Sequence, residues 1–289
     1  MSGYRASGAP DAGDGSGLRA RLAGTRFADV RWVPETGSTN ADVLDEARNG
    51  AREGIVVVAD HQTAGRGRRT RTWVAPPGAS LLVSVLLRPP ADVAGAVTMA
   101  VGVALAGAVR ELAGVDVGLK WPNDLVVDDR KLAGILAEAD WPAGSSMSAG
   151  YRAPAPYERL PVVVGAGVNV AWPRPEDDVA VHELADTATA LNWLGADVAR
   201  DDLLVVFLRR LEDHYGGLVR DRSAEAVLAE WRRRSATLGR RVRVDLGPDD
   251  VEGTAVDVTG EGHLVVETLE GGRRTLAVGD VVHLRPAPR

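Results

Sequence analysis

Hydrophobic and polar positions along the chain predict strands and helices in mixed order, followed by a run of short strands. Apolar runs at Ile55 to Ala59, Ser80 to Leu87 and Pro161 to Val170 predict buried strands. The alanine- and glycine-rich segment from Val93 to Leu112 predicts a buried helix and no membrane span, because charged residues follow its apolar part. Shorter patterns predict further strands: one that starts at Arg31, and others at Val117 to Trp121, Leu125 to Val127 and Lys131 to Glu138. Helical spacing predicts helices after Asn40 and at Glu183 to Leu194, Asp201 to Leu218 and Ala224 to Ser235.

The pattern changes near Leu238, where short alternating strands separated by Gly or Asp turns begin. They fall at Arg241 to Asp245, Gly253 to Val258, Leu264 to Glu267, Arg273 to Ala277 and Val281 to Leu284. A run of this length predicts a small antiparallel barrel of the SH3 type. We therefore expect a flexible leader at residues 1–24, a larger domain at 25–237 and a small β domain at 238–289. Loose loops are expected at 141–160 and 172–179.

Composition narrows the class of protein. The 289 residues are 45% hydrophobic and 26% charged, as in an ordinary globular protein, and the net charge is -6. Bulk electrostatics therefore do not favour nucleic acid or anionic membranes. The absence of cysteine excludes disulfides, thiolate nucleophiles and cysteine-ligated metals, and the five histidines show no spacing typical of a zinc site. No signal peptide is visible, so a cytoplasmic location is expected.

A basic segment stands out against this acidic background. The segment from His61 to Trp73, here called the arginine loop, holds four arginines and no acid, and it follows a predicted buried strand. Gly65 and Gly67 let its backbone approach a ligand closely. The loop therefore predicts an anion site, most simply a phosphate site. Arginine–glycine runs also occur in RNA-binding tails and on solvated surfaces, but the buried strands on both sides of this one weigh against a disordered segment.

Two further polar groups accompany the predicted elements. Ser38, Thr39 and Asn40 begin a helix; one of them is enough for a cap, so the set could also hold a polar ligand. Asn123 and Asp124 follow Pro122 in a turn.

Together these segments resemble the biotin protein ligases. The resemblance rests on Gly-Ser-Thr-Asn at 37–40, the segment 62–73, Lys-Trp-Pro-Asn-Asp at 120–124, Lys-Leu-Ala-Gly-Ile-Leu at 131–136 and Gly-Ala-Gly-Val-Asn-Val at 165–170. Each motif is weak alone, but their order makes the set specific. The resemblance implies an α+β fold with a central mixed sheet, like that of class II aminoacyl-tRNA synthetases, and a terminal SH3-like barrel. It also implies ATP-dependent activation of biotin, with Mg²⁺, and transfer of biotin to a lysine of a biotin carboxyl carrier protein.

The resemblance also assigns roles by position. Lys131, Arg66 and Arg68 are expected to be catalytic. The same three residues are expected to contact biotin together with Ser38, Thr39, Asn40, Gln62, Gly67 and Trp73. ATP is expected at Lys120, Asn123 and Asn169, and Mg²⁺ at Asp124, which could equally be a turn cap. Arg69 and Arg71 are expected to support the loop, and Trp121 to be a core residue.

The sequence departs from the family pattern at Thr70, where the family usually has glycine. If this position needs a positive φ, threonine is strained there. Some members carry a winged-helix DNA-binding domain. No such domain is expected in the leader, so no repressor function is expected. No nucleic-acid or membrane partner is expected either, and a homodimer is possible. Two rival interpretations are a lipoate or octanoate ligase of the same fold, which has less use for Ser38, Thr39, Asn40 and Gln62, and an RNA-binding module.

Overall fold

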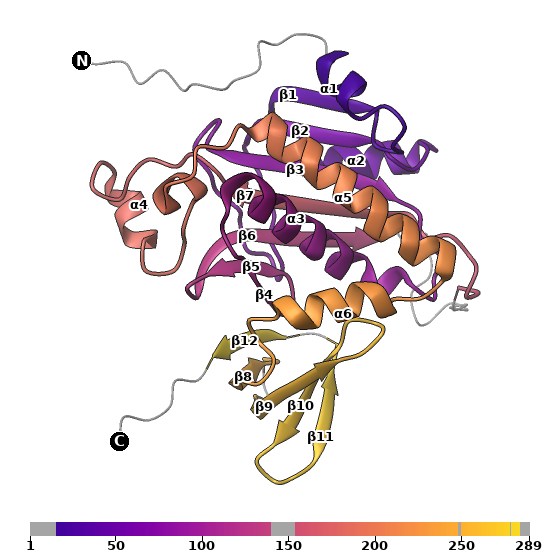
Figure 1. Ribbon diagram of the computed structural model, residues 1–289, viewed down its shortest axis with the longest axis vertical. Helices are drawn as coiled ribbons and strands as arrows, with labels where there is room; N and C mark the ends of the chain where they lie inside the picture. Colours follow the sequence, from indigo (N-terminus) through magenta and orange to yellow (C-terminus); the bar gives the residue numbers. More distant parts are fainter. Residues whose placement is uncertain (1–15, 140–153, 248–249, 278, 284–289) are drawn as a thin grey trace.

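The computed structural model describes residues 16–139, 154–247, 250–277 and 279–283, which form two β-sheets and their covering helices (Figure 1). The first part of the predicted leader, residues 1–15, and most of the predicted loop at 141–160 lie outside these residues.

The larger sheet positions the rest of the molecule. Within the described residues it has seven strands in the order β1-β2-β3-β7-β6-β5-β4. β1 and β2 are parallel and the other neighbours are antiparallel, so the predicted mixed sheet is confirmed. Its strands are β1 (Val30–Thr36), β2 (Val56–Gln62), β3 (Ser80–Leu87), β4 (Gly118–Lys120), β5 (Asp124–Val127), β6 (Arg130–Ala139) and β7 (Val162–Asn169).

Helices cover both faces of this sheet. α3 (Val97–Ala113), α5 (Arg200–Asp221) and α6 (Glu225–Arg234) lie together on one face, where side chains such as Val83 and Val85 meet them. α2 (Thr39–Arg48) lies on the other face, where its Val43 packs with Leu86. The segment Ala94–Ala113 is long and apolar enough to cross a membrane by composition, but its most apolar 18-residue stretch is 72% buried inside the protein. The predicted core helix is therefore confirmed.

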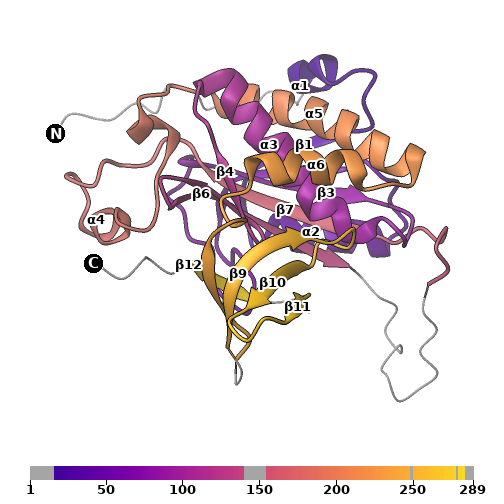
Figure 2. The ribbon, with the colours of Figure 1, turned by 60° about the horizontal axis from the view of Figure 1, so that its bottom comes forward.

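The C-terminal strands form a second, antiparallel sheet. Its order is β11-β10-β9-β8-β12, and Figures 1 and 2 show it beside α6. Side chains on alternate positions, among them Val242 and Val266, make its core because one face of each strand turns inward. Trp121, 2% exposed, joins the two parts by donating from Nε1 to the Gly262 carbonyl at 2.9 Å, so it is a core residue as expected. The strands are β8 (Arg241–Asp245), β9 (Val251–Val258), β10 (Leu264–Thr268), β11 (Arg273–Leu276) and β12 (Asp280–His283).

The expected flexible leader is wrong for its last residues. α1 (Ser16–Arg21) is a helix that packs against α5, with Leu18 and Leu22 buried. Arg21 adds an ion pair of 2.9 Å to Asp201 at the start of α5. A short amphipathic segment gains its stability from such packing, which local composition does not reveal.

The predicted helix from Glu183 to Leu194 is also wrong. The chain forms α4 (Val179–Leu184) and then a strap at residues 185–190, which is a turn at 185–187 followed by a β-bridge at Ala188. A 3₁₀ helix follows at Leu191–Leu194. The strap pairs with β6: the Lys131 N–H donates to the Thr187 carbonyl at 2.8 Å, and Thr189 donates back to Lys131 at 2.9 Å. Pairing with a neighbouring strand has overridden the helical pattern of the segment.

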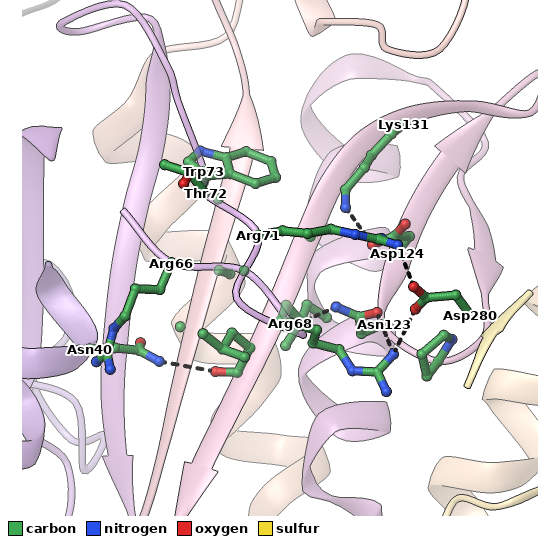
Figure 3. Close-up of a pocket in the computed structure, with 18 of the residues that line it drawn as sticks. Asn40, Arg66, Arg68, Arg71, Thr72, Trp73, Asn123, Asp124, Lys131 and Asp280 are labelled. Carbon is green, nitrogen blue, oxygen red and sulfur yellow. Dashed lines mark hydrogen bonds and ion pairs between the residues drawn. The ribbon is translucent and has the colours of Figure 1, made fainter. Parts of the chain in front are cut away.

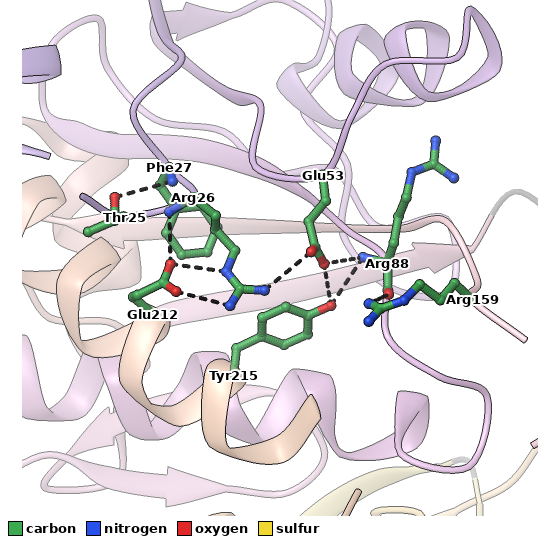
Figure 4. A network of polar contacts seen from close by, with 8 residues as sticks. All are labelled: Thr25, Arg26, Phe27, Glu53, Arg88, Arg159, Glu212 and Tyr215. Atoms are coloured by element: carbon green, nitrogen blue, oxygen red, sulfur yellow. Dashed lines mark hydrogen bonds and ion pairs between the residues drawn. The ribbon is translucent and has the colours of Figure 1, made fainter. Parts of the chain in front are cut away.

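A polar network ties the N-terminal segment to α5 (Figure 4). Arg26 binds both carboxylate oxygens of Glu212, at 3.0 and 2.9 Å, and also Glu53 at 3.2 Å. The buried Tyr215 hydroxyl donates to Glu53, and burial together with that carboxylate raises the pKa of Tyr215. Glu53 also accepts from the backbone N–H of Arg88 at 2.7 Å, directly after β3, so the network fixes α5 to the end of this strand.

Candidate active site

A cavity of about 360 Å³ opens where the N-terminus of α2, the arginine loop, the β5–β6 hairpin and β12 meet. This volume is in the range of small-molecule sites. Three glycines form part of its floor: Gly134 on β6, and Gly165 and Gly167 on β7. A Cβ on Gly165 would lie 2.1 Å from Asn40 Oδ1, and one on Gly167 would lie 2.5 Å from the Trp73 ring. Glycine at these positions therefore lets the side chains of Asn40 and Trp73 lie directly against β7 at the cavity.

One end of the cavity is lined by hydroxyl and amide groups. Gln62 Oε1 accepts from the backbone N–H of Thr39 at 2.8 Å. Because a backbone N–H can only donate, this bond fixes which atom of the Gln62 side-chain amide is the oxygen. The other atom, Nε2, has no acceptor among the described residues. Ser38 is the N-cap residue of α2, but its hydroxyl makes no cap bond and has no hydrogen-bond partner among the described residues. Thr39 Oγ1 lies 2.7 Å from Ser84 Oγ, deep in the sheet.

The arginine loop is a small hairpin above this floor. Arg66 pairs with Thr72, and the Arg71 N–H donates to the Arg68 carbonyl at 3.1 Å, which closes a tight turn. Its two central residues, Arg69 and Thr70, have φ of 52° and 61°. Positive φ at both central positions is the pattern of a type I′ turn, which favours Asn and Gly. The expected strain at Thr70 is therefore confirmed.

Carboxylates from different parts of the chain hold the arginines of the loop, and one of them, Asp245 of β8, pairs with Arg69 at 3.8 Å. Arg66 lies beside Asn40 and pairs with Glu138 of β6 at 3.1 Å, whereas Arg68 and Arg71 turn toward Asp280 of β12 (Figure 3). The Arg68–Asp280 distance is 3.5 Å. The loop thus bridges the seven-stranded sheet and the C-terminal sheet.

Arg68 is the most enclosed of these arginines. Burial lowers the pKa of its guanidinium, and the neighbouring Arg69 adds to this, while Asp280 acts in the opposite direction. The side chain stays charged, since an arginine pKa is very high to begin with. Arg68 also approaches Asn123 Oδ1 at 3.5 Å; Asn123 is fixed by donating from Nδ2 to the Ile135 carbonyl at 2.6 Å.

Lys131 projects into the cavity from the start of β6. Its Nζ lies 2.7 Å from Asp124 Oδ1 and 5.6 Å from the centre of the Trp73 ring. The Trp73 indole N–H is buried with no acceptor among the described residues. Lys120, at the end of β4, also lines the cavity and has no acidic partner within the described part of the chain.

Cations outnumber acids around the cavity and loop, although the chain is acidic overall. The cations are Arg66, Arg68, Arg69, Arg71, Lys120 and Lys131, and the acids are Asp124, Glu138 and Asp280. Such a site attracts and holds anions.

The structure brings nearly all the predicted site residues to this one cavity. Ser38, Thr39, Asn40, Gln62, Arg66, Gly67, Arg68, Trp73, Lys120, Asn123, Asp124 and Lys131 all line it. Asn169 does not: its Nδ2 donates to the Thr189 carbonyl at 3.0 Å, next to the strap, and the side chain is 4% exposed. Glu138 and Asp280 were missed by sequence analysis. The floor glycines carried a signal, since glycine at alternate positions of an apolar strand marks a close approach.

A metal ion has limited support from these side chains. Within the described ranges no group of three or more His, Cys, Asp or Glu residues could hold one. Asp124 is a single carboxylate already paired with Lys131. This fits Mg²⁺ only if phosphate oxygens and water supply most of its ligands, which is the usual way Mg²⁺ binds at nucleotide sites.

Two family models and several curated proteins match this chain. The Biotin/lipoate A/B protein ligase family matches residues 32–141, and the Biotin protein ligase C terminal domain matches residues 237–284. The biotin--[acetyl-CoA-carboxylase] ligase of Mycobacterium tuberculosis is 39% identical over 94% of this chain and 96% of that protein.

The chain belongs to the biotin protein ligase family.

Other members of the family extend the comparison. The bifunctional ligase/repressor of Escherichia coli is 30% identical over 82% of this chain and 69% of its own length. The biotin protein ligase from Aquifex aeolicus in complex with biotin and ATP superposes with a TM-score of 0.70 at 26% identity, over 90% of this chain and all of that one. The biotin ligase fold with a C-terminal β domain, expected from the resemblance, is confirmed.

Proposed function

We propose that the chain couples biotin to ATP, forming biotinyl-5′-AMP and pyrophosphate, and then passes the biotinyl group to one lysine of a biotin carboxyl carrier protein of an acyl-CoA carboxylase. The observation that carries this proposal is that one cavity holds both a hydroxyl–amide end and a cluster of cations. Biotin has the same two parts, a polar ureido head and a carboxylate. The family relationship supports the same reaction.

The hydroxyl–amide end suits the ureido head. Gln62 Nε2 is an unused donor for the ureido carbonyl, and the Ser38 and Thr39 hydroxyls offer acceptors for the ureido N–H groups. The Trp73 ring lies against Gly134 and Gly167 and offers an apolar surface for the tail. A lipoyl chain has no groups to satisfy these donors and acceptors, so binding it would leave them unpaired at a cost.

The cationic end suits the reaction itself. A carboxylate oxygen of biotin attacks the α-phosphorus of ATP. The bond between this phosphorus and the oxygen that bridges it to the β-phosphate breaks, and pyrophosphate leaves with that oxygen. Both reactants are anions, and each cation about 4 Å away offsets their repulsion by roughly 4 kcal/mol at an effective dielectric near 20, before desolvation. Lys131, Arg66 and Arg68 are assigned this role. No protein nucleophile is needed, so the absence of cysteine is no obstacle.

The nucleotide is assigned to the side nearer β12. Lys120 lines the cavity there without an acidic partner among the described residues, and Asn123 is held beside Arg68. Mg²⁺ would be held by phosphate oxygens with Asp124, and it would neutralise charge on the phosphates. In the second half-reaction the carrier lysine attacks the acyl carbon and AMP leaves with the electron pair. We place this reaction in the cytoplasm, where ATP and carrier meet.

Incubation with labelled biotin, ATP, Mg²⁺ and a biotin carboxyl carrier domain tests the proposal. Label is expected on the carrier, on its acceptor lysine, and only when ATP is present. Replacement of that lysine by arginine in the carrier is the matched control. Pyrophosphate release with lipoate and none with biotin would instead identify a lipoate ligase, a class that the first matching family also includes.

A further inference from the structure

Glu138 lies on β6 beyond the motifs that define the family resemblance, yet both its oxygens are engaged at the cavity. Oε1 pairs with Arg66 at 3.1 Å, and Oε2 accepts from Asn40 Nδ2 at 2.7 Å. The Glu138 side chain is 26% exposed and that of Arg66 is 41% exposed. Within the described chain Arg66 has no other acidic partner, since Asp280 binds the arginines at the other end of the loop.

The contact continues from Glu138 into the hydroxyl–amide end of the cavity. Asn40 is fixed in orientation because its Nδ2 donates to Glu138 and to the Leu136 carbonyl, so its Oδ1 accepts from Ser84 at 2.6 Å. Ser84 is 2.7 Å from Thr39, whose hydroxyl and N–H contact Gln62. Five consecutive polar contacts, Arg66–Glu138–Asn40–Ser84–Thr39–Gln62, therefore join the arginine loop to the groups assigned to the ureido head.

We propose that Glu138 is a positioning residue that holds the arginine loop closed over the biotin end of the cavity and also aligns the ureido-binding groups through Asn40. This inference rests on the proposed function. An acyl-adenylate is a mixed anhydride that acylates any amine it meets in solution. An enzyme that delivers it to one lysine must retain it until the carrier docks. Glu138, the acid that pairs with Arg66, is placed to hold the loop for that time.

Two substitutions separate the two contacts of Glu138. In Glu138→Gln the amide oxygen still accepts from Asn40, whereas the charge that attracts Arg66 is lost. In Glu138→Ala both contacts are lost. Glu111→Gln is the matched control, because it removes an acid from a 2.6 Å ion pair with Arg210 on the far side of the molecule, at the junction of α3 and α5.

Pyrophosphate release is measured with biotin and ATP in the absence of carrier, together with biotinylation of a bystander protein rich in lysine. Wild type is expected to give a burst of about one pyrophosphate per active site, followed by slow turnover as the adenylate escapes. Glu138→Gln should give the same burst and the same KM for biotin as wild type. It should raise the rate of slow turnover and the bystander labelling about three- to fivefold, which corresponds to the free energy of one partly exposed ion pair. Glu138→Ala should show the same leakage and also a raised KM for biotin. Glu111→Gln should match wild type.

Unchanged slow turnover and bystander labelling in Glu138→Gln would overturn the inference, with the proposed function intact as long as the burst is seen. A smaller burst and a lower melting temperature without faster leakage would also overturn it, since those changes indicate a merely structural role. Absence of a burst from the wild-type protein would instead refute the proposed function itself.

Discussion

The Lys131 ammonium lies 2.7 Å from the carboxylate of Asp124, which projects from the neighbouring strand of the same hairpin. This pair holds a flexible lysine over the cavity before any anion arrives. When a carboxylate and phosphates enter, they compete with Asp124 for the ammonium, which then lies where negative charge develops.

Replacement of Lys131 by alanine should therefore abolish catalysis and leave the fold intact. We expect adenylation to fall by at least about 10²-fold, the usual cost of one removed charge-stabilising donor. The measurement is biotin-dependent pyrophosphate exchange, with the melting temperature as the control for folding. Activity near that of wild type would show that Lys131 does not contact the reacting groups.

Gly165→Ala should damage the hydroxyl–amide end of the cavity. The added Cβ would lie 2.1 Å from Asn40 Oδ1, so the Asn40 amide must move and its contacts to Ser84 and Glu138 break. We expect the KM for biotin to rise by about tenfold or more, which corresponds to about 1.4 kcal/mol of lost binding, with a smaller change in the KM for ATP.

Gly260→Ala is the matched control, because a Cβ there meets nothing within 4 Å. Equal effects of the two substitutions on the KM for biotin would contradict the assigned site.

Thr70→Gly should relieve strain in the arginine loop. Thr70 has a φ of 61°, a conformation that costs an L-residue roughly 1–2 kcal/mol. Part of the gain is offset because glycine is more flexible when unfolded. We expect the melting temperature to rise by about 2–4 °C, measured by calorimetry. Thr72→Gly, in the same loop without positive φ, should not stabilise the protein; a similar gain there would remove the explanation.

Acid should weaken the contact between α5 and the N-terminal segment. Burial alone would raise the pKa of Glu212, but its hydrogen bonds to Arg26 and the Arg26 charge lower that pKa below 4.5. A lowered pKa in the folded state stabilises the fold above pH 4.5, and the gain is lost as the pH falls through the folded-state pKa.

Glu212→Gln should therefore cost about 2 kcal/mol of unfolding free energy at pH 7, as is typical for hydrogen bonds to a charged group. Urea denaturation at a series of pH values measures the difference between the two proteins. That difference should be constant from pH 6 to 8 and shrink below pH 4.5. A difference that grows toward low pH would show that Glu212 is not the group that titrates.

Much of the fold could be predicted from local patterns. The strand at Ser80–Leu87 agrees with its prediction at both ends, and the C-terminal strands follow their predicted positions closely. These elements bury continuous or alternating apolar residues, so neighbouring positions of the sequence are enough to predict them. The arginine loop and the helix start at Ser38 were visible for the same reason, because each is a short segment whose composition is unusual by itself.

The sequence by itself determined which segments carry the chemistry: the arginine loop, the polar helix start at residues 38–40, and Lys131 with its hairpin. Only the tertiary structure decided what these groups contact. Asp280 pairs with Arg71, more than two hundred residues away in the sequence, and Glu138 pairs with Arg66. Asn169 donates to the Thr189 carbonyl and does not line the cavity. Such contacts depend on how strands pair and sheets pack, and a charged side chain looks the same in the sequence whether its partner is water, a ligand or a distant arginine.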